Sequence, residues 1–158
     1  MVYPEKTVST LTYVGFWRRA AALVIDVVAL FIPSLIVGLI AGAVLGSGNE
    51  AFVVGGIAGI LLAGVYFVLM ETSHNQGTLG KMVIRAKVTD ENGRPITRDQ
   101  AISRFIVKEI PSILSLVPIA AIAWLVFLLL TVWAVTVAKS ERKQGPHDMF
   151  ARTLVIDK

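Results

Sequence analysis

The sequence contains no cysteine, so neither a disulfide framework nor thiol chemistry is available to it. Charge is also scarce. Only 16% of the 158 residues are charged, against about a quarter in a typical soluble domain. Hydrophobic residues make up 55% of the chain and the mean hydropathy is +0.72, a composition that indicates a membrane protein of one domain.

Several function classes lack their sequence signals. The net charge is +4, but no basic patch is interleaved with aromatic residues, so we expect no nucleic-acid binding. There is no phosphate-binding loop, no HExxH element and no nucleophile paired with a base, so we expect neither an enzyme nor a cofactor. His147 beside Asp148 is a single pair of ligand types and predicts no metal site.

Long apolar runs predict the membrane helices. Two runs predict spans at about 16–45 and 51–70, the first with a kink at Pro33. A later apolar region is interrupted by prolines, which predicts a hinged hairpin of two shorter helices at about 102–117 and 119–138. Whether residues 102–117 span the membrane, re-enter it or lie on its surface stays open, because their first half carries charges.

The fold class expected is therefore an all-α integral membrane protein, a bundle of about four membrane helices with a small cytoplasmic β element. Residues 1–15 form a lead-in and residues 16–158 a single membrane domain. Alternating β-branched residues predict strands at 82–89 and 152–157, which are each other's most obvious partners. Thr97, with Gln100 three residues later, predicts the start of a helix through a capping box.

The basic residues predict the topology. Lys and Arg gather in residues 71–104 and again from residue 139 to the end, whereas the loop at 47–50 has none. Cytoplasmic segments collect these residues, so both basic segments should face the cytoplasm. Residues 102–138 should then cross an even number of times, and Pro118 is the expected hinge.

Asp26 is the most unusual residue of the first span, because a carboxylate near a helix centre costs about 2.5–3.5 kcal/mol on insertion scales. Arg19 lies seven residues earlier on the same helix face, but about 10.5 Å away along the axis and leaning away from Asp26. Each must therefore find a partner elsewhere. Asp26 either fixes the packing of neighbouring helices or handles a cation or a proton.

Small residues recur every four positions in both spans, the spacing that allows close helix contact. The rows include Gly38 and Gly42 in the first span and Gly55 and Gly59 in the second. They predict either packing of the two spans within one chain or a homo-oligomer. A transport role favours the oligomer, because four helices alone enclose little of a pathway.

Four stretches, in order, resemble the RDD family of bacterial membrane proteins, named for one arginine and two aspartates. "RRAAALVID" resembles its first motif, with Arg19 and Asp26 as arginine and first aspartate. "QGTLGKMVIRAKV" resembles its central stretch, with Gly77 as an intruding residue, and "ISRFIVK" its basic helix, with Arg104. "HDMFART" resembles the closing element, with Asp148 as the second aspartate and Arg152 where glycine is commoner.

The resemblance implies a multi-pass protein of the bacterial cytoplasmic (inner) membrane, and the basic segments place both termini in the cytoplasm. The function expected is that of a small transporter or transporter subunit whose Asp26 handles a cation or proton. The alternative is a non-catalytic accessory or regulatory protein that binds other membrane proteins, which the small size of the chain favours.

Among the charged residues, we expect Asp26 to pair with Arg104 or Lys108 across helices, and Arg19 to lie near Asp148. An alternative for Lys108 is an aliphatic stem that reaches the surface and leaves the ammonium in water.

Overall fold

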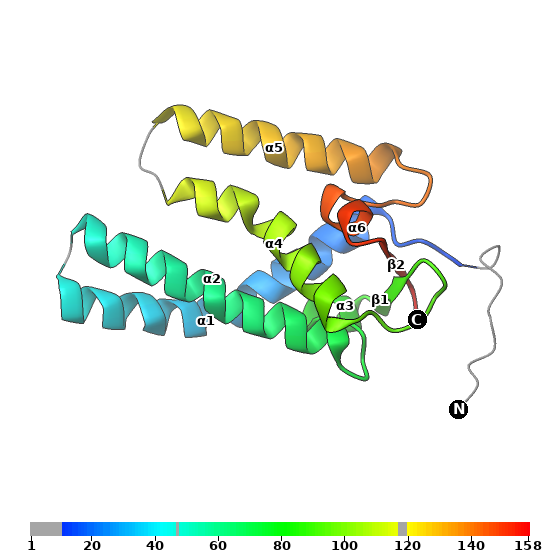
Figure 1. The fold of residues 1–158 in the computed structure, drawn as a ribbon, viewed down its shortest axis with the longest axis horizontal. Coiled ribbons are helices and arrows are strands. Elements are labelled where there is room, and N and C mark those ends of the chain that lie inside the picture. The colour runs from blue at the N-terminus through cyan, green and yellow to red at the C-terminus, as the bar shows by residue number, and fades with distance from the viewer. Residues whose placement is uncertain (1–10, 47, 117–119) are drawn as a thin grey trace.

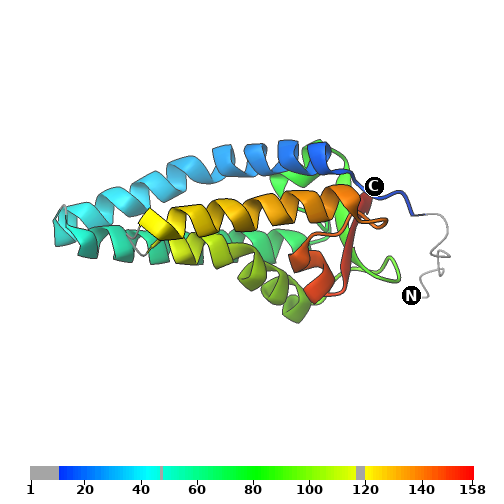
Figure 2. The same ribbon diagram turned by 90° about the horizontal axis from the view of Figure 1, so that it is seen from above.

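The computed structural model describes residues 11–46, 48–116 and 120–158, with the side chains of residues 120 and 121 excepted. Two long helices, α1 (Phe16–Leu45) and α2 (Asn49–Thr72), form an antiparallel hairpin. α1 continues through Pro33. Helices α4 (Arg98–Ser115) and α5 (Ala120–Lys139) lie beside this hairpin in both views (Figures 1 and 2). The predicted hinge at Pro118 lies outside the described residues.

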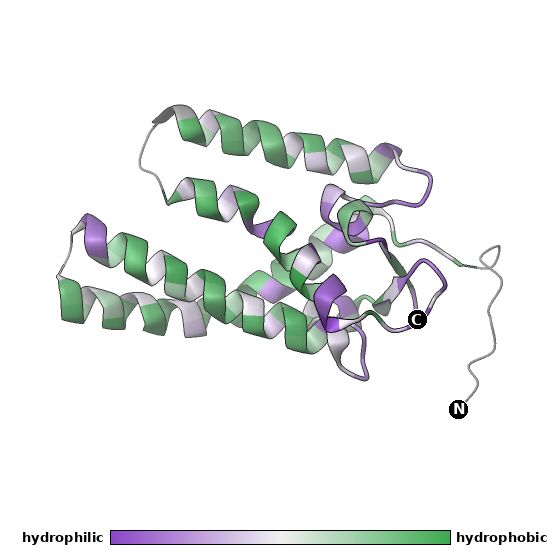
Figure 3. Cartoon of the chain, in the orientation of Figure 1, coloured by the Kyte–Doolittle hydropathy of each residue, from purple (hydrophilic) through white to green (hydrophobic). Residues whose placement is uncertain are grey.

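Three helical segments of the described chain are long and apolar enough to cross a membrane: α1, α2 and residues 122–139 of α5. They are mostly hydrophobic along their length in Figure 3, whereas polar residues gather at the end of the bundle that carries both described chain ends. α4 is not among these three segments, because five charged residues lie in its first twelve positions. The expected count of about four membrane helices is therefore not confirmed. The mostly helical membrane fold with a small sheet is confirmed.

Glycines bring α2 close to both of its neighbours. A Cβ on Gly55 would lie 3.4 Å from the Ala41 side chain of α1, so this position packs within the chain. A Cβ on Gly56 would lie 2.3 Å from Leu116, and one on Gly64 2.9 Å from Phe105. Larger side chains at these two positions would push α4 away from α2.

The polar end of the bundle holds two short helices and a two-stranded sheet. Strand β1 (Ala86–Asp90) follows α3 (Leu79–Val83), and strand β2 (Thr153–Asp157) follows α6 (Pro146–Phe150). The strands pair antiparallel, with Val88 opposite Val155. This confirms the predicted pairing, and it places the segments after α2 and after α5 at the same end of the bundle. The first strand was expected at 82–89, but it begins at Ala86, because α3 extends to Val83 and Arg85 has a left-handed backbone.

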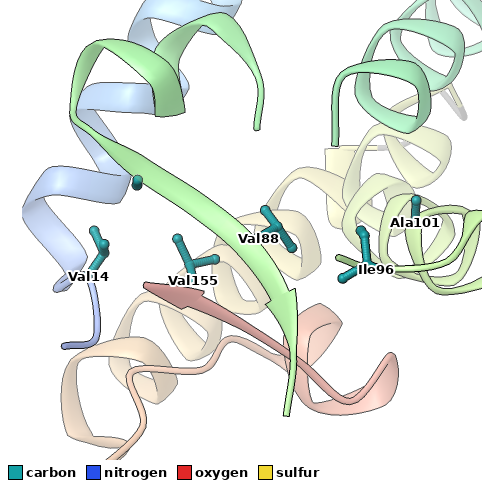
Figure 4. Close-up of a cluster of buried hydrophobic side chains, with 6 residues drawn as sticks. Val14, Val88, Ile96, Ala101 and Val155 are labelled. Carbon is teal, nitrogen blue, oxygen red and sulfur yellow. The ribbon is translucent and has the colours of Figure 1, made fainter. Parts of the chain in front are cut away.

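The sheet has a small hydrophobic core of its own, drawn in Figure 4. Val14, at the end of the lead-in, is fully buried there, and its N–H donates to the Val155 carbonyl at 3.0 Å. Ile96 and Ala101 close the core from the start of α4. The predicted capping box is present at this start, with Thr97 and Gln100 as its two members. The core thus packs the residues at the start of α1 and of α4 against the sheet.

Candidate functional site: a buried charge network beside a cavity

Asp26 lies in α1 and is only 3% exposed. Its carboxylate accepts three hydrogen bonds, all from neutral donors: the Tyr66 hydroxyl at 2.7 Å, the Thr78 hydroxyl at 2.6 Å and the Gly80 N–H at 2.8 Å. The Tyr66 oxygen in turn accepts from the Leu79 N–H at 3.0 Å. Asp26 therefore joins α1 to α2 and to the start of α3.

The residue at position 80 must be glycine for this contact to form. A Cβ on Gly80 would lie 1.9 Å from the Ala22 carbonyl oxygen, inside the backbone of α1. The expected pairing of Asp26 with Arg104 or Lys108 is wrong, since neither residue forms an ion pair with it. The donors of Tyr66 and α3 satisfy the carboxylate instead. This geometry is that of the alternative interpretation, in which Asp26 fixes helix packing.

Arg104 is at the centre of a second set of buried polar groups. It lies in α4, is 3% exposed, and its Nε donates to Glu71 Oε2 of α2 at 3.0 Å. Its Nη1 bonds both the Asp148 carboxylate of α6 and the Thr153 hydroxyl of β2. Glu71 also bonds Lys81 of α3.

Arg19 extends this set to α1. Its Nη1 lies 2.5 Å from Asp148 Oδ2, and its Nε donates to the Val14 carbonyl at 2.9 Å. The expected proximity of Arg19 and Asp148 is confirmed. We call the continuous chain of ion pairs the charge network; its members are Lys81, Glu71, Arg104, Asp148 and Arg19. It joins α1, α2, α3, α4 and α6 at the polar end of the bundle.

The local electrostatics of α6 follow from burial and from its charged neighbours. Burial alone would raise the pKa of Asp148, but a protonated His147 and the Arg104 guanidinium hold that pKa below its ordinary value. The Gly145 N–H also donates to Asp148 at 3.0 Å. Burial lowers the pKa of His147 to about 4, although Asp148 opposes this shift. At neutral pH, α6 therefore presents a carboxylate and a neutral imidazole.

Lys108 lies near the charge network, where its charge acts on Glu71, but it forms none of the ion pairs of that network. Its Nζ is 3.1 Å from the centroid of the Phe67 ring, a cation–π contact. Among the described ion pairs, none includes Lys108. Its ammonium thus has an aromatic face as its neighbour, where the sequence predicted either water or Asp26.

A cavity of about 320 Å³ separates parts of α1, α2, α4 and α5 beside the charge network. Its walls are mostly apolar. The candidate residues Arg19, Asp26, Arg104 and Lys108 all line it, so the structure brings four of the five predicted residues to one space. The fifth, Asp148, contacts two of these residues, Arg19 and Arg104, through ion pairs.

Sequence reasoning missed most of the partners. Glu71 and Lys81 are ten residues apart, across a turn, so no helical spacing joins them. Thr78 and Gly80 reach Asp26 from more than fifty positions along the chain. The sequence did carry a signal of an unusual backbone conformation. At Arg152, where the resemblance to the family expects glycine, the backbone is left-handed with φ of 51°, the conformation that glycine adopts most readily.

Comparison with known proteins places the chain in a family over most of its length. The model of the RDD family matches residues 13–152, a range that includes Arg19, Asp26 and Asp148. The chain is 26% identical over 162 residues to an uncharacterised protein of Bacillus subtilis (strain 168), YxaI. That match covers 91% of this chain and 97% of the relative. No solved structure matches the chain. With its apolar helices and this match over most of its length, the chain belongs to the RDD family of membrane proteins.

Proposed function

We propose that the protein is a non-catalytic accessory protein of the bacterial inner membrane that binds other membrane proteins. The observation that carries this proposal is the environment of Asp26. A carboxylate that binds a cation must offer free lone pairs, and neutral donors take three of the about four acceptor sites of this one. Asp26 thus serves as a fixed acceptor between helices.

The other buried acids are engaged in the same way. Glu71 bonds two cations, Lys81 and Arg104, and Asp148 bonds Arg19 and Arg104. Removing one member of a buried pair typically costs about 3–5 kcal/mol. A transport cycle that released these carboxylates in turn would repeatedly break the contacts that join the helices.

The outer faces of the long helices offer surface for a protein partner. Val28 of α1 is 67% exposed and Leu61 of α2 is 65% exposed. A photo-crosslinking amino acid at each position, in cells, tests the proposal. A specific partner gives one discrete protein adduct from one face, which persists as the expression level is lowered. Adducts to lipid alone from both positions would contradict it.

The orientation belongs to the same proposal. Because the chain has no cysteine, single cysteines at Glu91 and Glu141 report their side of the membrane directly. Both residues are exposed. An impermeant maleimide in intact cells should label neither, and should label both after the membrane is opened. Labelling of either from outside would contradict the cytoplasmic placement.

A second candidate function is transport of a cation or proton, as a small transporter or as a transporter subunit. One observation favours it: Asp26 and Glu71 both line the cavity, so two carboxylates border a space within the bundle. Cation-driven proton movement by the purified protein in liposomes separates the two candidates. The accessory role predicts none.

A further inference from the structure

The cavity between the helices opens toward the lipid. Leu23 of α1 and Leu130 of α5 line it, and yet they are 47% and 51% exposed. These side chains therefore form a rim that lies partly inside the cavity and partly on the outer surface of the bundle. In a membrane this outer surface is in contact with acyl chains, so a lipid has a lateral route into the cavity.

The wall of the cavity carries more cations than anions. Four cationic side chains line it, those of Arg19, Lys81, Arg104 and Lys108, against two carboxylates, those of Asp26 and Glu71. Asp148, which pairs with Arg19 and Arg104, adds one more negative charge, and Glu109 next to Lys108 adds another, so the charges around the cavity balance in number. Burial lowers the pKa of Lys108 to about 7, and an anion beside its ammonium would favour the charged form.

Two of these cations have donors without an acceptor among the described residues. Arg19 uses Nε and Nη1, and its Nη2, which is fully buried, has no hydrogen-bond partner among those residues. Lys108 contacts the Phe67 ring and is in none of the described ion pairs. Buried donors in proteins almost always have an acceptor, so this wall is suited to a ligand that supplies anionic oxygens.

We propose that the cavity binds the phosphate group of an anionic phospholipid, with Lys108 as its donor, Arg19 as a second cation of the wall, and the first part of an acyl chain leaving between Leu23 and Leu130. The volume of about 320 Å³ is near the lower end of small-molecule sites, about 300–1,000 Å³. It holds a headgroup and leaves most of the chains in the bilayer. Basic pockets between membrane helices bind lipid headgroups by the same physics. This inference is independent of whether the protein transports an ion.

A tryptophan in the wall makes the site measurable. Trp133 lines the cavity, whereas Trp17 and Trp124, the other two tryptophans, are 82% and 77% exposed. Trp17→Phe with Trp124→Phe leaves Trp133 as the single reporter. Brominated acyl chains quench tryptophan on contact. The protein is placed in phosphatidylcholine vesicles that contain a minor fraction of brominated phosphatidylglycerol, or the same fraction of brominated phosphatidylcholine.

The expected result is stronger quenching of Trp133 by brominated phosphatidylglycerol. Lys108→Met should weaken the relative affinity for this lipid about fivefold, the equivalent of about 1 kcal/mol per basic side chain near an anionic lipid. The matched control is Lys139→Met, because Lys139 is exposed at the end of α5 and does not line the cavity. Equal quenching by the two lipids, or a preference unchanged by Lys108→Met, would overturn the proposal.

Two further arms complete the test. Ala134→Phe fills the cavity without changing its charge, and it should also abolish the preference, which decides the matter if Lys108→Met does not fold. Inorganic phosphate, added to protein in phosphatidylcholine alone, tests a soluble source of the same group. A rise in melting temperature that depends on Lys108, without any preference for phosphatidylglycerol, would assign the site to free phosphate and refute a lipid ligand.

Discussion

Arg19 and Asp148 are 129 positions apart in the sequence, and their Nη1 and Oδ2 atoms are 2.5 Å apart in the fold. The first lies one turn into α1, and the second lies in α6, after the last membrane helix. Their ion pair therefore joins the beginning and the end of the membrane domain. Asp148 also pairs with Arg104, so residues from three motifs of the family meet in one buried network.

Arg104 is the residue whose loss should damage this network most. Arg104→Gln leaves Glu71 and Asp148 with one cationic partner fewer each. Unpaired buried charges of this kind typically cost about 3–5 kcal/mol, which corresponds to a fall in melting temperature of about 10 °C for a chain of this size. Thermal unfolding in detergent measures it. Arg18→Gln is the control, because the Arg18–Asp157 pair is partly exposed and such pairs contribute little.

Asp26 should be nearly as sensitive, although it has no ion pair. In Asp26→Asn the new NH2 group faces either the Gly80 N–H, which cannot accept a hydrogen bond, or the Thr78 hydroxyl, which must turn to accept one. Loss of the charge-assisted hydrogen bonds should cost about 1–3 kcal/mol. The same melting measurement applies, with exposed Asp99→Asn as the control. Equal melting of Asp26→Asn and the control would contradict the packing role.

Acid should destabilise the fold through His147. Its folded-state pKa of about 4 lies below the ordinary value of 6.5, so the unfolded state takes up the proton first. The stabilisation is complete above pH 6.5 and is lost as pH falls toward 4, by a total of order 3 kcal/mol. The melting temperature should therefore fall over this range.

His147→Gln should flatten that fall, while His74→Gln, on an exposed loop residue, should leave it in place. At still lower pH, protonation of Asp148 should destabilise the fold further, because the pKa of Asp148 is also lowered in the folded state. An acid slope that survives His147→Gln would show that the imidazole is not its source.

The glycine rows allow packing and self-association to be separated. Gly55 contacts α1 within the chain, so Gly55→Leu should lower the melting temperature in any oligomeric state. A Cβ at Gly59 would meet no atom of the described chain within 4 Å, so Gly59→Leu should leave the monomer intact. If a homo-oligomer forms through this row, Gly59→Leu reduces its mass in detergent. A wild-type protein that is already monomeric by mass would rule the oligomer out.

The sequence predicts the parts of this fold that depend on local pattern. Apolar runs predicted α1 and α2 to within two residues at each end, and alternation predicted the strand pairing. The expectation that Arg19 and Asp148 lie close together is confirmed, whereas the even number of membrane crossings behind it stays a prediction. These predictions succeed because helix length and charge asymmetry are set by the bilayer rather than by distant contacts.

The partners of Asp26 could not be predicted in this way. The sequence argument assumed that a buried carboxylate needs a cation, whereas here a hydroxyl pair and one backbone N–H satisfy it. These donors approach because α3 passes over α1 at Gly80, a close contact that only the folded chain reveals. The role of Glu71 is hidden for the same reason, since both of its cationic partners come from other elements.

The central claim is that the buried charges hold the helices together and carry no ion. The most direct measurement uses the purified protein in liposomes that contain a pH-sensitive dye, challenged in turn with Na⁺, K⁺ and Li⁺ gradients. Wild-type protein and Asp26→Asn should both give the dye response of empty liposomes. Cation-driven proton movement by the wild-type protein that Asp26→Asn abolishes, with the variant folded and inserted to the same extent, would contradict the claim.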